Sequence, residues 1–195
     1  MPSHAAKADL LSNRFVESFV KFDYGVLDEA FEFEAWKLGR VPQGKTGCER
    51  WAPLSYKTDP TQLETLYARL PARFPSLYER LVVSYRWEEI DLQLHTLLAN
   101  PAGPDLNGLY LQISRHTALW SQLSRSGYLP FAKAPAGDYD PVCFDLKSRK
   151  KNRDCKIVRI KHEEILCNNR MKIASELAAS FEDLVAKTIA LAEKR

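Results

Sequence analysis

Apolar residues at the N-terminus recur at the spacing of one helix face, as in Leu11, Phe15, Phe19 and Phe22. We therefore expect residues 5–38 to be helical, in two segments that are broken near Gly25. Apolar and acidic residues alternate at 31–35, so a short strand there is an alternative. Residues 39–60 hold three glycines and three prolines, which predicts a loop. Residues 1–50 then form a helical extension and connector.

The middle of the chain combines helical periodicity with one alternating segment. Residues 60–69 begin with Pro-Thr and place their leucines on one face, which predicts a helix. A second helix is expected within 70–85, beginning near one of its two prolines. Residues 89–98 alternate apolar and polar side chains, the period of a half-buried strand. Residues 109–125 are expected to be helical again.

The last third of the chain predicts a sheet and a helix that covers it. Residues 128–132, 142–146 and 155–161 are short strand candidates separated by turn-rich segments, which is typical of an antiparallel meander. Residues 173–193 carry an apolar stripe at helical spacing, so a single long helix is expected there. The prediction is an α+β fold, a predominantly antiparallel sheet covered by helices.

Composition is that of an ordinary globular chain. The 195 residues are 45% hydrophobic and 27% charged. No apolar run approaches the roughly 20 residues that span a bilayer, and the N-terminus lacks the apolar core and cleavage site of a signal peptide. We therefore expect a cytoplasmic protein without a membrane partner.

The four cysteines are scattered and form no C-x-x-C pair. In a reducing compartment they are expected to be free and mostly buried thiols. A zinc site from Cys143, Cys155, His162 and Cys167 would match no structural zinc spacing, so no metal or other cofactor is predicted.

Residues 39–46, GRVPQGKT, fit the phosphate-loop pattern G-x-x-x-x-G-K-[ST] from Gly39 to Thr46. The pattern needs a buried strand before it and a helix after it, because the helix N-terminus and backbone amides hold the phosphates. The residues before it are half-polar, and Gly47 and Pro53 oppose a helix after it. We interpret the match as a coincidence and keep a nucleotide-binding enzyme as an alternative function.

Three carboxylates lie close together in the segment 128–146, YLPFAKAPAGDYDPVCFDL. Gly137 permits a tight turn, and the side chain of Asp138 is suited to bond the backbone two residues on. Pro141 keeps Asp140 extended and starts the next strand. Asp138 and Asp140 are therefore interpreted as turn residues of a hairpin rather than as catalysts.

His162, Glu163 and Glu164 suggest either acid/base chemistry or a strand end followed by a helix. Carboxylates are favoured in the first turn of a helix by its macrodipole, and no nucleophile has a defined place beside them, so the helix is preferred.

Eight Lys/Arg residues and one acid lie between 147 and 161. Because aromatic residues are not interleaved, this segment predicts a solvated loop rather than a nucleic-acid platform.

The order of several segments resembles the SUKH superfamily, which includes yeast cell-wall-synthesis regulators linked to killer-toxin resistance and many bacterial toxin-immunity proteins. The segments span about 51–190 and are LETLYARLPARFPSLYERLVVSYRW, GYLPFAKAPAGDYDPVCFDL, KIVRIKHEEIL and ASFEDLV. The resemblance implies a SUKH-like domain over 51–195 with a short helix, an LP helix, a strand meander and a C-terminal helix. It also implies a binding module without catalysis.

This resemblance leads to a hypothesis of function: the chain is an immunity protein that occludes the active site of a bacterial toxin domain. A regulatory scaffold of the cell-wall type is the other reading within the same family. Immunity proteins that block nucleases are often acidic, whereas this chain has a net charge of +3, which disfavours a nuclease target. The partner-binding candidates are Trp87, Glu88, Glu89, Asp138, Tyr139, Asp140 and Asp145, with a second basic surface at Arg149, Lys150, Lys151 and Arg153.

Overall fold

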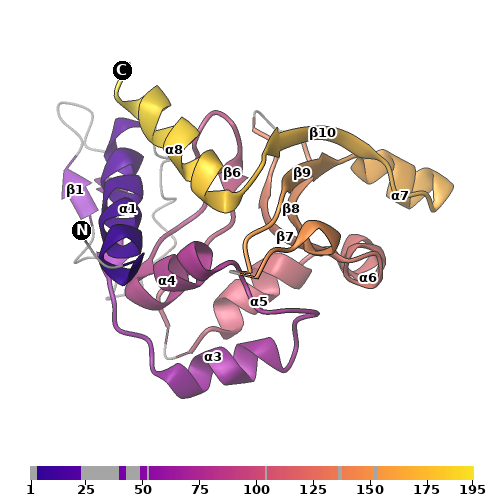
Figure 1. Cartoon of the computed structure of the whole chain (residues 1–195), viewed down its shortest axis with the longest axis horizontal. Coiled ribbons are helices and arrows are strands. Elements are labelled where there is room, and N and C mark those ends of the chain that lie inside the picture. Colours follow the sequence, from indigo (N-terminus) through magenta and orange to yellow (C-terminus); the bar gives the residue numbers. More distant parts are fainter. Residues whose placement is uncertain are drawn as a thin grey trace.

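The fold is α+β, as predicted, and its centre is an antiparallel sheet between helices (Figure 1). The computed structural model describes residues 4–22, 40–42, 49–51, 53–103, 105–135, 138–151 and 153–195. The six-stranded sheet has the strand order β10-β9-β8-β7-β6-β5, with every neighbouring pair antiparallel. No helix of these described ranges is both long enough and apolar enough to cross a membrane.

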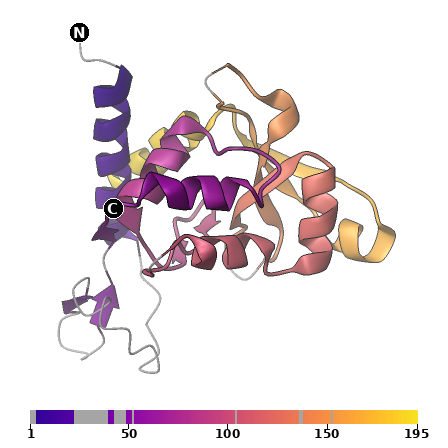
Figure 2. The same cartoon turned by 90° about the horizontal axis from the view of Figure 1, so that it is seen from below.

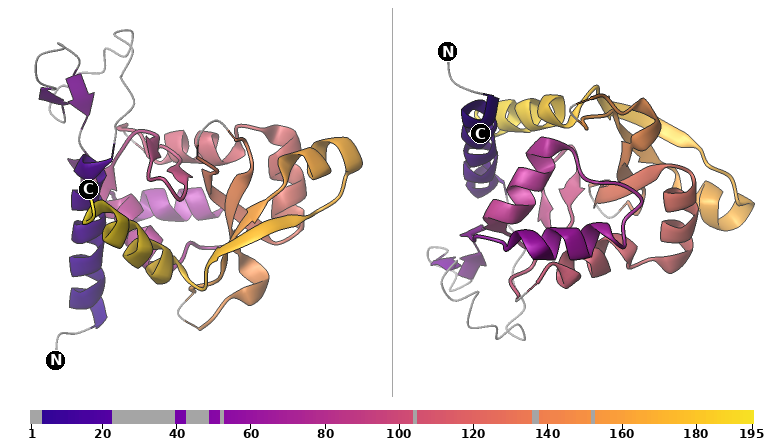
Figure 3. Two further views of the ribbon diagram at one scale, coloured as in Figure 1. Left: turned by 90° about the horizontal axis from the view of Figure 1, so that it is seen from above. Right: turned by 60° about the horizontal axis from the view of Figure 1, so that its bottom comes forward.

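The N-terminal helix α1 (His4–Ser18) and the 3₁₀ turn η1 (Phe19–Lys21) form part of the main core. Three of the four predicted apolar positions are fully buried here: Phe15, Phe19 and Phe22. The helix packs beside the C-terminal helix α8, and Figures 2 and 3 show the two side by side. The second helical segment expected up to residue 38 lies outside the described residues.

The expected connector contains short strands. β1 (Arg40–Pro42) pairs with β2 (Glu49–Trp51), and β3 (Leu54–Ser55) pairs with β4 (Tyr85–Arg86). The last pair joins the connector to the end of the second predicted helix. Prolines and glycines in the sequence indicate a loop but carry no information about pairing with a distant strand.

Both helices predicted within 60–85 are confirmed. α3 (Pro60–Tyr67) begins at Asp59, whose carboxylate accepts a hydrogen bond from the backbone of Thr61 at 2.8 Å. α4 (Ser76–Ser84) begins directly after Pro75 and buries one apolar face, formed by Leu77, Tyr78, Leu81 and Val82. Proline fits these positions because the first amides of a helix have no intrahelical partner.

The strand expected at 89–98 is a tight hairpin instead. β5 (Ile90–Asp91) and β6 (Thr96–Leu97) pair with each other, and the chain reverses between them. Asp91 accepts a hydrogen bond from the backbone of Gln93 at 2.7 Å, and Gln93 has a φ of 67°. This side-chain turn interrupts the alternating pattern without glycine or proline, so the sequence pattern did not reveal it.

The helix expected at 109–125 is two helices, α5 (Asn107–Ser114) and α6 (Thr117–Arg125). The break falls at His116, whose φ of −99° and ψ of 86° are not helical. No glycine or proline marks the break in the sequence. It redirects the chain so that α6 packs on β7 (Tyr128–Lys133), the strand that follows.

The predicted meander is confirmed in β7, β8 (Pro141–Asp145) and β9 (Ile157–Ile160), with the 3₁₀ turn η2 (Leu146–Ser148) after β8. Side chains of β8 alternate as expected between two buried faces. Phe144 points to the main core with α4 and α8, whereas Cys143 points to a second cluster with Leu119 and Leu123 of α6. The sheet is therefore covered on both sides.

The single long helix expected at 173–193 is wrong in its first part. Residues Ile173–Ala178 form the edge strand β10, and α8 covers Phe181–Ala192. The side chain of Ser180 accepts a hydrogen bond from the backbone of Asp183 and so begins α8. β10 is mostly exposed. Its few apolar residues happen to lie at helical spacing from those of α8, which is why the sequence predicted one continuous helix. Before β10, α7 (His162–Asn168) confirms the helix preferred at His-Glu-Glu.

Aromatic rings fill the space between the sheet and the helices. Phe131 of β7 and Phe144 of β8 stack at 4.2 Å between ring centroids. Tyr78 of α4 and Phe181 of α8 meet both rings edge-on. The hydroxyl of Tyr78 is buried and makes no hydrogen bond to any residue that the structure describes. Its burial raises the pKa of Tyr78 well above the ordinary value.

We expect Tyr78→Phe to raise the free energy of unfolding by about 1 kcal/mol, because a buried hydroxyl without a partner costs about 1–3 kcal/mol. Urea denaturation measures this change. Tyr67→Phe is the matched control: the hydroxyl of Tyr67 donates to Glu79 at 2.5 Å, so its removal should lower stability by about 2 kcal/mol. A loss of stability in Tyr78→Phe would contradict the assignment of an unpaired hydroxyl.

His95 lies in the β5–β6 hairpin and is fully buried. Neither of its ring nitrogens has a hydrogen-bond partner within the described chain, and one neighbour is the ring of Phe131 at 6.1 Å. Burial disfavours the charged imidazolium and lowers the pKa of His95 to about 4. The folded protein therefore keeps this side chain neutral.

Stability should fall as the pH drops from the ordinary histidine pKa of about 6.5 toward 4, because the unfolded chain binds a proton that folded His95 refuses. The contribution of His95 to this loss in the free energy of unfolding reaches roughly 3 kcal/mol at about pH 4. His95→Leu should remove that contribution, whereas Leu10→Ala, at an exposed position without a titratable side chain, should leave the pH dependence of stability unchanged. Urea denaturation at several pH values between 7 and 4 measures this change. The expectation is contradicted if the free energy of unfolding falls equally with pH in wild type and in His95→Leu.

Candidate functional site

The loop between β7 and β8 presents an exposed aromatic ring on a fixed base. Tyr139 is 63% exposed, whereas its neighbour Asp140 is 6% exposed. The predicted turn role of Asp138 is confirmed, because its carboxylate accepts a hydrogen bond from the backbone of Asp140 at 3.0 Å. The backbone of Ala134 donates to the carbonyl of Asp140 at 2.8 Å and closes the loop. Tyr139 is thus held at both sides.

Asp140 is the centre of a polar network that joins three elements. Its Oδ1 accepts from the backbone N–H of His162 at 2.9 Å and lies 2.8 Å from the ring Nδ1 of His162. Its Oδ2 accepts from Nε of Arg159 at 2.9 Å. The same guanidinium reaches Asp138 Oδ2 through Nη2 at 2.5 Å. The start of α7, strand β9 and the Tyr139 loop are therefore tied together.

These contacts set the charge of the buried carboxylate. Burial by itself would raise the pKa of Asp140, but the hydrogen bonds from His162 and the Arg159 guanidinium outweigh it and hold the pKa below its usual value. Asp140 stays ionised and paired at neutral pH. A group in this state is suited to positioning other residues rather than to exchanging protons.

Asp138, Asp140 and His162 also form the geometry of a possible cation site, since one ligand atom from each lies within 4.8 Å of the others. Oxygen and imidazole ligands suit several divalent metals. However, the guanidinium of Arg159 bridges the two carboxylates and already supplies the positive charge. A metal ion would have to displace it, so we interpret the cluster as an ion-pair network.

A cavity of about 330 Å³ lies beside this loop, between α5, α6 and the sheet. Tyr139 lines it and also meets the ring of His162 at 6.2 Å, so the cavity and the Asp140 network share this residue. Its apolar wall consists of Leu98, Ile113, Leu119, Trp120, Leu123, Pro130, Ala132 and Pro141. Its polar residues are Glu89, Gln112, Arg115, His116 and Lys133.

The cavity brings together two residues that the sequence placed far apart. Glu89 and Tyr139 both line it, and Glu89 pairs with Lys133 of β7 at 2.6 Å. Glu88 precedes Glu89 in the chain but does not line the cavity, and burial raises the pKa of its carboxyl. Of the predicted partner-binding residues, Glu89 and Tyr139 therefore lie at the same cavity.

Trp87 does not belong to that surface, and its placement at an interaction edge is wrong. Its side chain is 1% exposed, and its indole N–H donates to the carbonyl of Leu98 at 2.9 Å. A bridge with Asn100 fixes its backbone. Arg86 before it is also buried, and the indole fills the core against Tyr78.

Asp145 is also separate from the Tyr139 loop. It is the last residue of β8, at the end opposite Asp140, and five residues of strand span about 17 Å. Its carboxylate accepts a hydrogen bond from the backbone of Lys147 at 3.1 Å and so caps η2. The role that the structure gives Asp145 is local.

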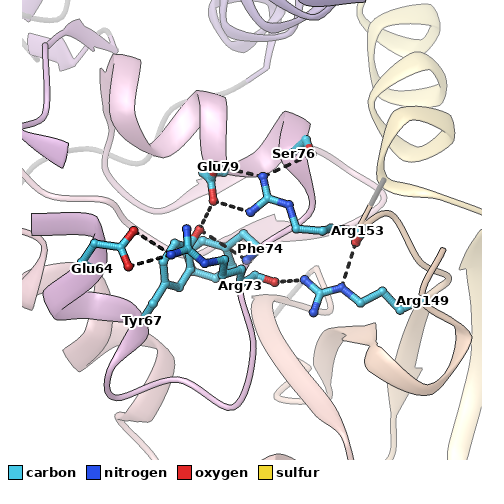
Figure 4. A network of polar contacts seen from close by, with 8 residues as sticks. All are labelled: Glu64, Tyr67, Arg73, Phe74, Ser76, Glu79, Arg149 and Arg153. Carbon is cyan, nitrogen blue, oxygen red and sulfur yellow. Dashed lines mark hydrogen bonds and ion pairs between the residues drawn. The ribbon is translucent and has the colours of Figure 1, made fainter. Parts of the chain in front are cut away.

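The predicted basic surface is only partly free. Figure 4 shows Arg153 bound to Glu79 of α4, with N–O distances of 2.7 and 3.0 Å. Arg149 donates to the carbonyl of Arg73 and, through Nε, to the carbonyl of Arg153 at 3.4 Å. These two arginines fasten the loop to the α3–α4 turn. Lys150 and Lys151 stay exposed and are the part of this segment that a partner can reach.

The carboxyl of Glu79 is the anchor of that fastening. Burial opposes its charge, but hydrogen bonds from Arg153 and Tyr67 outweigh this effect and hold the pKa of Glu79 below its usual value. Arg73 lies over the ring of Tyr67 and pairs with Glu64 at 2.6 Å (Figure 4). Of the positive charges in this loop, that of Arg153 is thus neutralised by an internal ion pair.

The phosphate-loop match falls mostly outside the described residues. Its described part, Arg40–Pro42, is strand β1, and the next described segment is strand β2 rather than a helix.

Of the cysteines, Cys143 and Cys155 are buried in different hydrophobic clusters and Cys167 is exposed. Burial raises the pKa of Cys143 and Cys155, so both thiols stay protonated. Cys48 lies outside the described residues.

Sequence reasoning missed Arg159, Arg115 and Trp120 as site residues. Arg159 lies in the predicted strand 155–161, which is β9, but the sequence marks it only as part of a basic run and does not indicate that it pairs with Asp138 and Asp140. Arg115 and Trp120 meet the loop only through the break between α5 and α6. No signal in the sequence marked that break.

Comparison with known proteins adds no family assignment: no protein-family model and no curated protein sequence matches this chain.

We expect Asp140→Asn to lower the free energy of unfolding by about 2–3 kcal/mol, because the amide has no charge, keeps only one acceptor oxygen and turns an NH2 donor toward the guanidinium of Arg159 or the His162 side. Asp138→Asn removes the outer, more exposed carboxylate from the same arginine and should cost less than about 1 kcal/mol. Urea denaturation compares the two variants. Equal effects would show that Asp140 is not the centre of the network.

Proposed function

We propose that this chain is a non-enzymatic protein-binding module that holds its partner through the surface around Tyr139. The observation that carries the proposal is a tyrosine 63% exposed on a loop that Asp140 ties to β9 and α7. Exposed large aromatic side chains in well-ordered positions are the residues on which binding energy concentrates. A ring held in place before binding also loses little conformational entropy on binding.

The charged groups near Tyr139 favour binding over catalysis. Asp138 and Asp140 are both paired with Arg159, and the pKa of Asp140 lies below its usual value. A general acid or base works best with a pKa near the working pH. The carboxylates therefore serve as a rigid support, which is what an occluding surface needs.

Within this proposal, we favour an immunity protein that occludes a bacterial toxin domain. The resemblance to the SUKH superfamily implies that role, and it names a short helix, an LP helix, a strand meander and a C-terminal helix. α3, α4, the strands β7 to β9 and α8 occur in that order along the chain, with β4 to β6, α5 and α6 between α4 and β7 and with α7 and β10 before α8. The alternative role within the same superfamily, a regulatory scaffold, differs from immunity in the proteins that it binds.

The proposal predicts that Tyr139→Ala weakens partner binding by at least about 1 kcal/mol, because it removes the anchor ring while the hydrogen bonds of Asp140 to Arg159 and His162 stay in place. A tagged chain would be used to recover the partner from the native host, and the purified pair would be measured by calorimetry. Leu10→Ala is the matched control, since Leu10 is 62% exposed on α1. Unchanged affinity in Tyr139→Ala would overturn the assignment of this surface.

The identity of the recovered partner decides between the two family roles. A single toxin domain, inhibited at equal stoichiometry in its own activity assay, supports immunity. Several housekeeping proteins support a regulatory scaffold and overturn immunity. In both cases the Tyr139→Ala comparison tests the surface itself.

A further inference from the structure

The cavity beside Tyr139 has the size and composition of a small-ligand site. Its volume of about 330 Å³ is at the lower end of the range for such sites, roughly 300–1,000 Å³. Two helices and a strand build it: Ile113 comes from α5, Leu119 from α6 and Ala132 from β7. All three side chains are buried, so the wall is rigid and apolar. A few polar groups on such a wall are what orient a bound molecule.

Most of the polar groups that line the cavity are hydrogen-bond donors without a partner. Arg115 makes no ion pair or hydrogen bond with another described residue, and the same holds for the indole N–H of Trp120 and the amide of Gln112. Arg115 is exposed, whereas Gln112 and Trp120 are half-buried. The cavity therefore offers donors from α5, from α6 and from the link between them.

The charges around the cavity favour an anion. Glu89 is its one acidic residue and is already paired with Lys133 at 2.6 Å, which leaves the guanidinium of Arg115 uncompensated. The link to α6 adds to this bias, since His116 provides no side-chain cap for the first amides of the helix. An arginine guanidinium binds a carboxylate through two parallel hydrogen bonds.

We propose that this cavity binds a small organic acid, with an apolar or aromatic body against Ile113, Leu119 and Ala132 and its carboxylate at Arg115. Trp120 and Gln112 donate to the same end of the ligand or to a polar substituent. The cavity shares Tyr139 with the proposed protein-binding surface, but ligand binding here rests on Arg115, Trp120 and Gln112, so each proposal can fail without the other.

Phenylacetate is a suitable probe, and phenylacetamide is its uncharged control of nearly the same shape. Titration of the full-length chain, followed through the indole N–H resonances of its four tryptophans, should shift the signal of Trp120. Trp87 is a built-in reference because its indole N–H is buried and bonded to Leu98. The acid should bind about tenfold or more tightly than the amide, since hydrogen bonds to a charged group are the stronger ones.

Arg115→Gln should weaken phenylacetate binding by about tenfold or more and leave phenylacetamide binding unchanged. Arg125→Gln is the matched control, because Arg125 is exposed at the other end of α6. Both substitutions are at exposed positions, so both variants are expected to fold. The proposal is overturned if the Trp120 signal does not move, if acid and amide bind equally, or if Arg115→Gln binds phenylacetate like wild type.

Discussion

The stacked pair of Phe131 and Phe144 is the contact on which the rest of the structure depends. The two rings lie on neighbouring strands of the sheet, 4.2 Å apart, and the helices α4 and α8 each add one ring edge-on. α1 reaches the same core through Phe15, which meets Phe181. Removing large aromatic rings from a core costs several kcal/mol each, so this cluster determines where α1, α4 and α8 pack on this face of the sheet.

The same strands place the candidate site. β7 and β8 carry the aromatic pair in their middle, and the loop that joins them presents Tyr139 at one end of the sheet. Opposite faces of β7 serve different purposes, because Phe131 points to the main core while Pro130 and Ala132 line the cavity. A rigid sheet therefore supports both an exposed ring and a preformed cavity, without a large movement of the backbone.

Local patterns predicted the elements that depend on neighbouring residues. The helices at 60–67 and 76–84 and the meander of β7, β8 and β9 follow from spacing, prolines and alternation. The failures have a common cause: the turn at Gln93, the break at His116 and the edge strand β10 arise from side-chain turns or tertiary packing rather than from glycine or proline. The spacing of apolar residues does not by itself distinguish an exposed edge strand from a helix when the strand contains few apolar residues.

The sequence by itself determined the α+β class, the apolar stripe of α8 and the turn role of Asp138, because each depends on residues close together in the chain. Only the tertiary structure decided which charges are free. Arg149 and Arg153 bind groups of the α3–α4 region, and Asp140 is paired with Arg159 and His162. The packing also decided that Trp87 lies in the core rather than at the surface. Pairing over such distances follows from the packing of the elements, and that packing leaves Tyr139 and Arg115 available to other molecules.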